Sequence, residues 1–475
     1  MKIKMLTDKS IKELSEGLKK KEYSSREIVS ECLNNADNLD PEINSFITRA
    51  DKEKVVAESQ LSDKKRSEKD SVLSGIPFVL KDAYVTKGIR TTAASNILKQ
   101  YIPQYNATVY QKLLNENAIL LGKMNMDAWG HGGSSENTDF KPVHNPWDLE
   151  RVAGGSSGGP AAAISARMTV FAIGEDTGGS IRNPAAWCNI TGLKVTYGRV
   201  SRYGSIAYAS SFDTVGPMAK TAEDCAYILE KIAGKDPYDA TSSPHSAPRY
   251  SQYLNKSLKG LKIGLPQDLL EKGLDGEIKE SILKAVREFS LLGAEIIEVQ
   301  MPIFDYGLAV YYLIGPSETS SNLSRYDGIR YGETRNNFTP ETGRRIMIGT
   351  YALSAGYYDA YYRKAQKART LFIREYEKLL TKCDVIIMPV NPTPPTKIGE
   401  LIGDPLQNLL ADVFTVTQNP VGVPSLAVPC GFTSNKLPIG MQIIGKMFTE
   451  ELLLNIGHQY QQVTDWHKRK PKIIG

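Results

Sequence analysis

Two serines, each in its own glycine-rich loop, are the residues best suited to covalent chemistry. Ser156 lies in GGSSGG (154–159), Ser180 ends GEDTGGS (174–180), and Lys81 lies upstream in GIPFVLKD. Glycine neighbours allow sharp turns and a close approach of ligand, and they expose backbone N–H groups that can bind an oxyanion. Burial lowers the pKa of a lysine, which can then act as a base. Together these residues predict nucleophilic acyl transfer without histidine.

Other uses of these residues fit the sequence less well. A phosphate-binding P-loop needs Gly-Lys followed by Ser or Thr, whereas Pro160 follows the last glycine of the first loop. The dinucleotide fingerprint GxGxxG and the zinc motif HExxH are also missing. His131 is isolated in the sequence, and we do not expect a direct catalytic role for it. We expect Asp82 and Asp127 to orient or pair with other groups. Each loop could also be a plain tight turn at a helix start, a weaker interpretation for two such loops together.

The composition is that of an ordinary globular protein. The chain has 475 residues, of which 41% are apolar and 23% charged, and its formal net charge is +5. Such a mild charge does not indicate nucleic-acid binding by electrostatics alone. The five cysteines include no CxxC pair, which favours a reducing cytoplasm over a disulfide framework. No apolar run reaches the roughly 18 residues that span a bilayer, so we expect no membrane contact.

The elements that must position these residues can be predicted from apolar spacing. Ile11, Leu14 and Leu18 share a helix face, and Ser24 with Glu27 forms a capping box. From residue 75 the pattern changes to the strand–helix alternation of a mostly parallel sheet covered by helices. Lys81 follows the first of these strands directly, and strand ends are where active sites of α/β proteins gather. We predict strands at 76–80, 118–121, 171–174, 261–265, 294–299, 384–388 and 426–428.

We predict a single domain over residues 1–475. Its parts are an N-terminal helical segment (about 1–70), a core with Lys81 and both loops (about 71–233), a loop (234–248) and a further α/β part (249–475). The last part contains a strand–helix–strand unit, whose helix face has the spacing of Ile278, Ile282, Val286 and Phe289. A tyrosine-rich helical segment is predicted at 350–371.

These motifs resemble the amidase signature family, whose members hydrolyse amides with a serine, a second serine after a cis peptide bond and a lysine. GIPFVLKD, GGSSGG and DTGGSIR carry the resemblance, in this order, and it covers nearly the whole chain. It implies an α/β fold with a large mixed β-sheet covered by helices on both faces. Further segments resemble the A subunits of aspartyl/glutamyl-tRNA amidotransferases: NPWDLERVAGG, YGRVSRYGSIAYASSFDTVGPM, SNLSRYDGIRYG, RRIMIGTYALSAGYYDAYYRKAQ and LPIGMQIIGK.

The resemblance implies a role for each residue of the site. Ser180 is the nucleophile, Ser156 relays its proton and Lys81 is the base. The oxyanion is bound by the N–H groups of Thr177, Gly178 and Gly179. The substrate glutamine is bound by Arg345 at its α-carboxylate, by Asp412 at its α-ammonium group and by Tyr311, which lines the pocket. No metal is implied.

The resemblance also implies partners. In the family, ammonia from glutamine passes to a B subunit, which uses ATP and Mg²⁺ to activate the carboxylate of tRNA-bound glutamate, aspartate or both. A small C subunit wraps the pair into a cytoplasmic heterotrimer. We therefore expect this chain to bind no cofactor itself, and aminoacylated tRNA to be held mainly by the B subunit.

Three residues depart from the family pattern. Pro160, Arg167 and Glu175 stand where small residues are usual, and Glu175 lies beside the oxyanion loop. A carboxylate in that position would oppose the developing negative charge. We hypothesise that Arg167 pairs with Glu175 and turns it away from Ser180. The segment between Tyr331 and Arg344 is shorter than usual in the family. Its length affects whether Arg345 is the residue that aligns with the glutamine-binding arginine of the family.

Two other functions remain open at this stage. One is a free-standing amidase that acts on small amides, which would share the two loops. The other is a scaffold protein of the complex whose catalytic site has drifted. Intact Lys81, Ser156 and Ser180 argue against the scaffold, whereas Glu175 keeps that alternative open.

Overall fold

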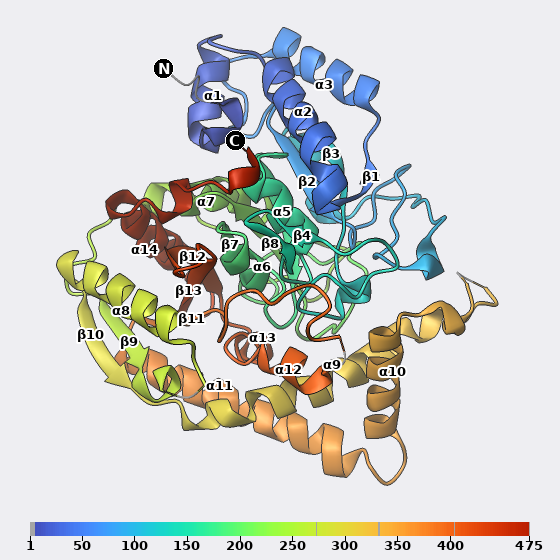
Figure 1. The fold of residues 1–475 in the computed structure, drawn as a ribbon, viewed down its shortest axis with the longest axis vertical. Coiled ribbons are helices and arrows are strands. Elements are labelled where there is room, and N and C mark those ends of the chain that lie inside the picture. Colours follow the sequence, from blue (N-terminus) through green and yellow to red (C-terminus); the bar gives the residue numbers. More distant parts are fainter. Residues whose placement is uncertain (1–4, 272, 331–332, 403, 475) are drawn as a thin grey trace.

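The centre of the fold is one large mixed sheet (Figure 1). The computed structural model describes residues 5–271, 273–330, 333–402 and 404–474. Within these residues eleven strands pair, and their order across the sheet is β1 (Phe46–Arg49), β3 (Ile119–Met124), β2 (Pro77–Lys81), β6 (Phe171–Asp176), β8 (Thr214–Ala219), β7 (Thr191–Lys194), β12 (Ser425–Phe432), β13 (Pro438–Gly445), β11 (Val385–Pro389), β9 (Lys262–Pro266) and β10 (Glu295–Val299).

The sheet has two parallel regions separated by an antiparallel centre. β2 runs parallel to β3 and β6, and β9 runs parallel to β10 and β11. Between them β6, β8, β7, β12 and β13 pair antiparallel. The large mixed sheet is thus confirmed, but the prediction of a mostly parallel one is wrong. The reason is that β8 and the β12–β13 hairpin return directly, without a crossover helix.

Helices cover both faces of the sheet, as predicted. Every residue of β2, β3, β6, β8, β11 and β13 is buried, which requires cover on each face. The helices are α1 (Ile11–Lys19), α2 (Ser25–Ile43), α3 (Lys52–Lys65), α4 (Thr108–Asn115), α5 (Gly158–Ser165), α6 (Arg182–Trp187), α7 (Ala222–Ile232), α8 (Gly276–Leu291), α9 (Gly307–Asn322), α10 (Pro340–Leu353), α11 (Lys364–Lys382), α12 (Pro405–Leu410), α13 (Gln418–Val421) and α14 (Glu450–Val463).

The predicted N-terminal helices form. The apolar face of α1 is buried, and Ser24 and Glu27 make the predicted capping box at the start of α2. The tyrosine-rich segment is not one helix: α10 ends at Leu353, a turn with Gly356 at φ +85° follows, and a π-helical turn (Asp359–Arg363) leads into α11. The left-handed glycine interrupts the helix that the pattern predicted.

Each predicted strand is present to within a few residues, in β2, β3, β6, β9, β10, β11 and β12. A separate two-stranded sheet, β4 (His144–Asn145) with β5 (Asp148–Val152), precedes the first serine loop. Residues 234–248 contain only turns and bends. The division into one domain with those parts stays a prediction, and Tyr331, where the shortened segment begins, lies outside the described residues. None of the described helices is long and apolar enough to cross a membrane.

Candidate active site

Lys81 lies at the end of strand β2, as predicted, and is fully buried. Its Nζ donates a hydrogen bond of 2.7 Å to Ser156 Oγ and contacts the carbonyl oxygen of Glu175 at 3.4 Å. Burial lowers the pKa of Lys81, while nearby carboxylates, Glu175 foremost, act to raise it. Lys81 and Ser156 are therefore in direct contact.

The first serine loop is held by close backbone approach. The Gly155–Ser156 peptide bond is cis, as the resemblance implied. A Cβ atom at Gly155 would overlap Asp127 Oδ2, so only glycine fits there. Asp127 in turn accepts the N–H groups of Ser135 at 2.9 Å and Asn137 at 3.1 Å. Asp127 thus orients the loop, as predicted, and burial raises its pKa to about 7.

The second serine loop leaves strand β6 and packs against the first. Gly179 has φ +131°, a conformation that other residues avoid. Thr415 Oγ1 donates to the carbonyl oxygen of Gly178 at 2.7 Å, which fixes the loop from outside. The N–H of Ser157 donates to the carbonyl oxygen of Ser180 at 3.1 Å. This bond joins the two serine loops.

Ser180 is nearly buried, with 7% of its surface exposed. Within the described part of the chain, no hydrogen bond joins its Oγ to Ser156 Oγ. Catalytic hydrogen bonds of this kind often tighten only when substrate is bound. The structure therefore shows the contact between Lys81 and Ser156, and the proton relay itself stays a prediction.

The three predicted oxyanion donors are not equivalent. The N–H of Gly179 already donates to Asp176 Oδ1 at 2.9 Å. It can bind an oxyanion only if it donates to both acceptors at once. Thr177 uses its hydroxyl to donate to Asp213 Oδ1 at 2.7 Å. Gly178 lies against Tyr311. A Cβ atom at Gly178 would come within 2.6 Å of Tyr311 Oη.

Two of the three predicted glutamine-binding residues line one cavity. Arg345 and Asp412 border this cavity of about 450 Å³ together with Asp127 and Tyr312. Tyr312 Oη donates to Asp412 Oδ2 at 2.9 Å, and burial raises the pKa of Asp412 to about 7. Tyr311, the third residue, stands edge-on to Tyr312, with ring centroids 4.9 Å apart. Because Asp127 also touches the first serine loop, this cavity adjoins the lysine–serine pair.

Arg345 is held at the wall of this cavity by two partners. Its Nη1 donates to Tyr208 Oη and its Nε to Glu341 Oε1, both at 2.7 Å. The guanidinium also lies over the rings of Tyr208 and Tyr312. Sequence analysis missed Tyr208, Tyr312 and Glu341, although Tyr208 lies in a segment that carried the resemblance.

The predicted pair of Arg167 and Glu175 does not form. Arg167 Nε donates to Asp8 Oδ1 at 3.2 Å, from a position behind helix α5. The Glu175 carboxylate faces Lys81 instead, with Oε2 3.6 Å from Nζ. The predicted pair was wrong because the sequence does not show that Asp8, in the N-terminal segment, lies beside Arg167 in the fold.

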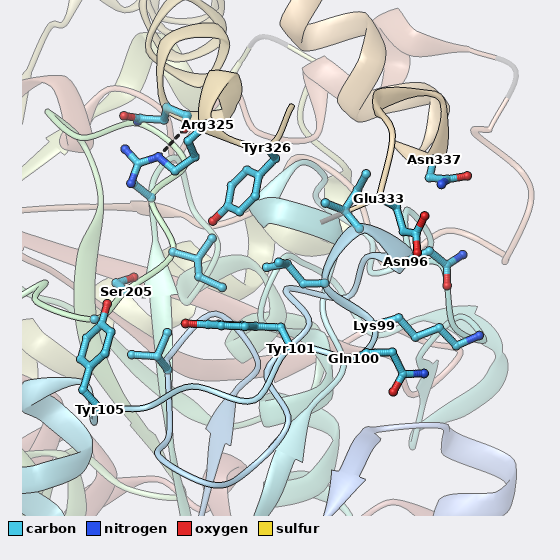
Figure 2. Close-up of a pocket in the computed structure, with 17 residues that line it drawn as sticks. Asn96, Lys99, Gln100, Tyr101, Tyr105, Ser205, Arg325, Tyr326, Glu333 and Asn337 are labelled. Carbon is cyan, nitrogen blue, oxygen red and sulfur yellow. Dashed lines mark hydrogen bonds between the residues drawn. The ribbon is translucent and has the colours of Figure 1, made fainter. Parts of the chain in front are cut away.

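Glu175 also connects the site to a second cavity of about 960 Å³ (Figure 2). Ser205 lines this cavity and donates to Glu175 Oε1 at 2.9 Å. Tyr101, Tyr105 and Tyr326 also line it (Figure 2). The cavity was not predicted, because its walls come from segments far apart in sequence.

Asn183 is a further residue that sequence analysis missed. It is fully buried near the start of α6, and both polar atoms of its side chain lack a hydrogen-bond partner. A Cβ atom at Gly133 would lie 3.2 Å from Asp412 Oδ1 and 3.9 Å from Asn183 Nδ2. Gly133 lines the cavity of about 450 Å³, so this amide lies behind the cavity wall. A buried polar group without a partner is rare and is a candidate for ligand binding. Its only signal in the sequence was its place three residues after Ser180.

The other candidates fall into structural roles. His131 contacts Thr342 and Thr319 through its two ring nitrogens, at 3.1 and 3.0 Å, and stands edge-on to Tyr208. It does not touch the serines. Asp82 pairs with Lys123 at 3.0 Å, as a pairing residue was expected to do. Among the described residues, no cluster of three His, Cys, Asp or Glu side chains is placed to hold a metal ion.

Known proteins resemble this chain over its full length. Curated relatives include the A subunit of glutamyl-tRNA(Gln) amidotransferase from Thermoanaerobacter pseudethanolicus, 47% identical, with 98% of each chain covered. The corresponding protein from Microcystis aeruginosa is also 47% identical, with 98% of this chain and 99% of the relative covered.

Solved structures of related proteins also match this chain over nearly its full length. The A subunit of the glutamyl-tRNA(Gln) amidotransferase from Thermotoga maritima matches with a TM-score of 0.84 and 38% identity, covering 99% of this chain and 98% of that one. A bacterial aryl acylamidase matches with a TM-score of 0.86 and 27% identity, with 98% of each chain covered. The family model described as amidase matches residues 27–454. The chain therefore belongs to the amidase family.

Proposed function

We propose that this chain is the glutaminase subunit of a tRNA-dependent amidotransferase. The observation that carries the proposal is the hydrogen bond of 2.7 Å from Lys81 Nζ to Ser156 Oγ, in a loop bonded to the loop of Ser180. The full-length similarity to A subunits of glutamyl-tRNA(Gln) amidotransferase supports glutamine as the amide.

The first chemical step forms an acyl-enzyme. Neutral Lys81 takes the proton of Ser156, and Ser156 takes the proton of Ser180 as Ser180 Oγ attacks the side-chain amide carbon of glutamine. The carbonyl oxygen becomes an oxyanion. The N–H groups of Thr177 and Gly178 stabilise it, at roughly 3–4 kcal/mol per donor, and Gly179 contributes by sharing its N–H with Asp176.

The second step releases ammonia and then glutamate. Lys81 returns its proton to Ser156, and Ser156 gives its own to the departing nitrogen as the carbon–nitrogen bond breaks. Water attacks the ester of Ser180 with the same residues acting as base. The carbon–oxygen bond to Ser180 breaks, glutamate leaves, and the proton returns to Ser180.

The cavity of about 450 Å³ is the proposed glutamine pocket. Arg345 binds the α-carboxylate through its planar fork of donors. Asp412 accepts from the α-ammonium group when its carboxylate is ionised. Tyr311 lies against Gly178 and stands edge-on to Tyr312, which lines the pocket. Binding of both the α-carboxylate and the α-ammonium group thus selects glutamine and directs its side-chain amide to Ser180.

The partners follow from the same proposal. The similar proteins are A subunits, which implies further subunits, and we propose a B and a C subunit in a cytoplasmic heterotrimer. The steps proposed for this chain use its side chains, its backbone N–H groups and water. ATP and Mg²⁺ would act at the B subunit, which would also hold most of the aminoacylated tRNA.

The test is glutamate release by the assembled complex, with and without ATP and Glu-tRNA. Native chain should hydrolyse glutamine faster when both are present, and Ser180→Ala should abolish the activity without loss of assembly. Fast turnover of unrelated small amides by the isolated chain, with no response to tRNA, would instead establish a free-standing amidase. Activity that survives in Ser180→Ala would refute the mechanism.

A further inference from the structure

The Glu175 side chain reaches Lys81 from the neighbouring strand. β2 and β6 run parallel and adjacent, with Leu80 in register with Ile173, so the ends of both strands meet. Glu175 Oε2 lies 3.6 Å from Lys81 Nζ, and both side chains are at most 2% exposed. Charges on buried side chains are screened less than charges at the surface, so their mutual effect is larger.

Glu175 is held in this position from its other side. Ser205 Oγ donates to Oε1 at 2.9 Å, which leaves Oε2 to face the lysine (Figure 2 shows Ser205 at the second cavity). Lys81 also contacts the backbone carbonyl oxygen of Glu175 at 3.4 Å. The lysine is thus fixed by Glu175 on one side and by Ser156 on the other.

Other charged groups surround the pair. Asp127, Asp176 and Asp213 each act on Lys81 with the same sign as Glu175, but Glu175 has the largest effect of the four. Burial raises the pKa of Glu175 and lowers that of Lys81, so burial opposes charge on both. Arg202 acts on Glu175 in the opposite sense and favours its ionised form.

We propose that Glu175 is a positioning residue for Lys81: its carboxylate holds the lysine nitrogen against Ser156 and strengthens that lysine as a base. The inference rests on the proposed role of Lys81 in the relay. When the Oγ–H bond of Ser156 breaks and an N–H bond forms on Lys81, positive charge develops 3.6 Å from this carboxylate. The attraction favours that transfer.

The carboxylate has a second consequence. A negative neighbour within 4–6 Å typically raises the pKa of a base by about 1–3 units. The neutral form of Lys81 is then populated only at higher pH. Glu175 therefore makes each transfer easier but moves the working range upward in pH.

The test compares Glu175→Gln and Glu175→Ser with native chain in the assembled complex. Sulfonylation of Ser180 by phenylmethanesulfonyl fluoride is measured against pH: the oxygen–sulfur bond forms, the sulfur–fluorine bond breaks, and the proton passes through Ser156 to Lys81. In both variants the acid limb should move down by about one pH unit or more. The plateau rate should fall about three- to tenfold, because a weaker base transfers protons less well.

Glutamine kinetics provide the second readout. The KM for glutamine should stay within about twofold, since Glu175 does not line the proposed glutamine pocket, while kcat falls with the plateau. Glu175→Asp should restore part of the native profile. Ser205→Ala, which keeps the carboxylate but frees it, should give an intermediate profile. The matched control is Tyr101→Phe, because Tyr101 lines the same second cavity without touching Glu175.

An acid limb that stays at the native pH in folded Glu175→Gln and Glu175→Ser would overturn the proposal. Thermal melts establish folding, and Ser205→Ala provides a further route if both variants are unstable. Failure of the proposed function has a different signature. In that case glutamine is not hydrolysed, yet the labelling profiles still report whether Glu175 acts on Lys81.

Discussion

Arg182 binds Asp176 with both arms of its guanidinium. Nε donates to Oδ2 at 3.1 Å and Nη2 to Oδ1 at 3.0 Å, and both side chains are fully buried. The same carboxylate accepts the N–H groups of Gly179 at 2.9 Å and Ile181 at 3.1 Å, the residues on either side of Ser180. Burial acts to raise the pKa of the Asp176 carboxyl, but Arg182 and the other donors lower it overall. Arg182 therefore fixes the loop of Ser180 through an ionised Asp176.

Arg182→Met is expected to destabilise the fold strongly. It leaves the Asp176 carboxylate buried without its charge partner, which typically costs about 3–5 kcal/mol. Urea denaturation measures the loss. The double variant Asp176→Asn with Arg182→Met is the control, and its loss should be less than the sum of the single losses. Equal stability of Arg182→Met and native chain would contradict this account.

Local pattern predicted much of the fold. The strands that carry Lys81 and the second serine loop, β2 and β6, are short apolar runs and were placed correctly. β1, β7, β8 and β13 were not predicted. β8 and β13 each contain glycine and proline, which disfavour strands in local statistics, and tertiary pairing overrides that preference here.

The site shows where sequence alone stops. Glycine loops and a lysine after an apolar run mark Lys81, Ser156 and Ser180 locally. The partner of Glu175 depends on which strands are neighbours and on their register, and neither is written in the spacing between residues. The cavity walls combine segments about two hundred residues apart or more, such as those of Asp127 and Arg345, and so could not be predicted from local pattern.

Lys81→Met should lower the rate of Ser180 acylation about a hundred- to ten-thousand-fold, because the general base is lost. The substitution removes the amine that donates the 2.7 Å hydrogen bond to Ser156 Oγ. Single-turnover labelling measures the rate. Lys112→Met is the matched control, since Lys112 is also a desolvated lysine, bonded to carbonyl oxygens of Ile232 and Ala233. A similar rate loss in both variants would show a general effect on the fold.

Arg345→Gln should raise the KM for glutamine about ten- to a hundredfold, with a smaller change in kcat. A charged hydrogen bond to the α-carboxylate is worth about 1.5–3 kcal/mol. Arg344→Gln is the informative comparison, because Arg344 also lines the pocket and binds Glu341 at 2.7 Å. If Arg344→Gln had the larger effect, the assignment of Arg345 would be wrong.

Glutamine affinity should rise with pH up to about 7. Burial raises the pKa of Asp412 to about 7, so below that pH the carboxyl is mostly protonated and does not attract an ammonium group. Each unit below the pKa should weaken binding about tenfold. Calorimetry on Ser180→Ala avoids turnover. Asp412→Asn should bind weakly at every pH, and a pH slope that persists in this variant would assign the titration elsewhere.

Asn183→Ala should not reduce stability by more than a few tenths of a kcal/mol, because both of its buried polar atoms are unpaired in the native chain. Denaturation midpoints measure this. The same variant should raise the KM for glutamine several-fold if the amide is reserved for ligand. A marked loss of stability with unchanged KM would show that Asn183 serves the fold.

The pairing of Arg167 has a consequence for biosynthesis. Asp8 binds Arg167, behind the helix that follows the first serine loop, and it also binds Lys470. Figure 1 shows the two ends of the chain on the same side of the molecule. A ribosome makes residues 8 and 167 well before residue 470, so this three-residue cluster is complete only once Lys470 has been made. Until then Asp8 has its ion pair with Arg167 but lacks the one with Lys470.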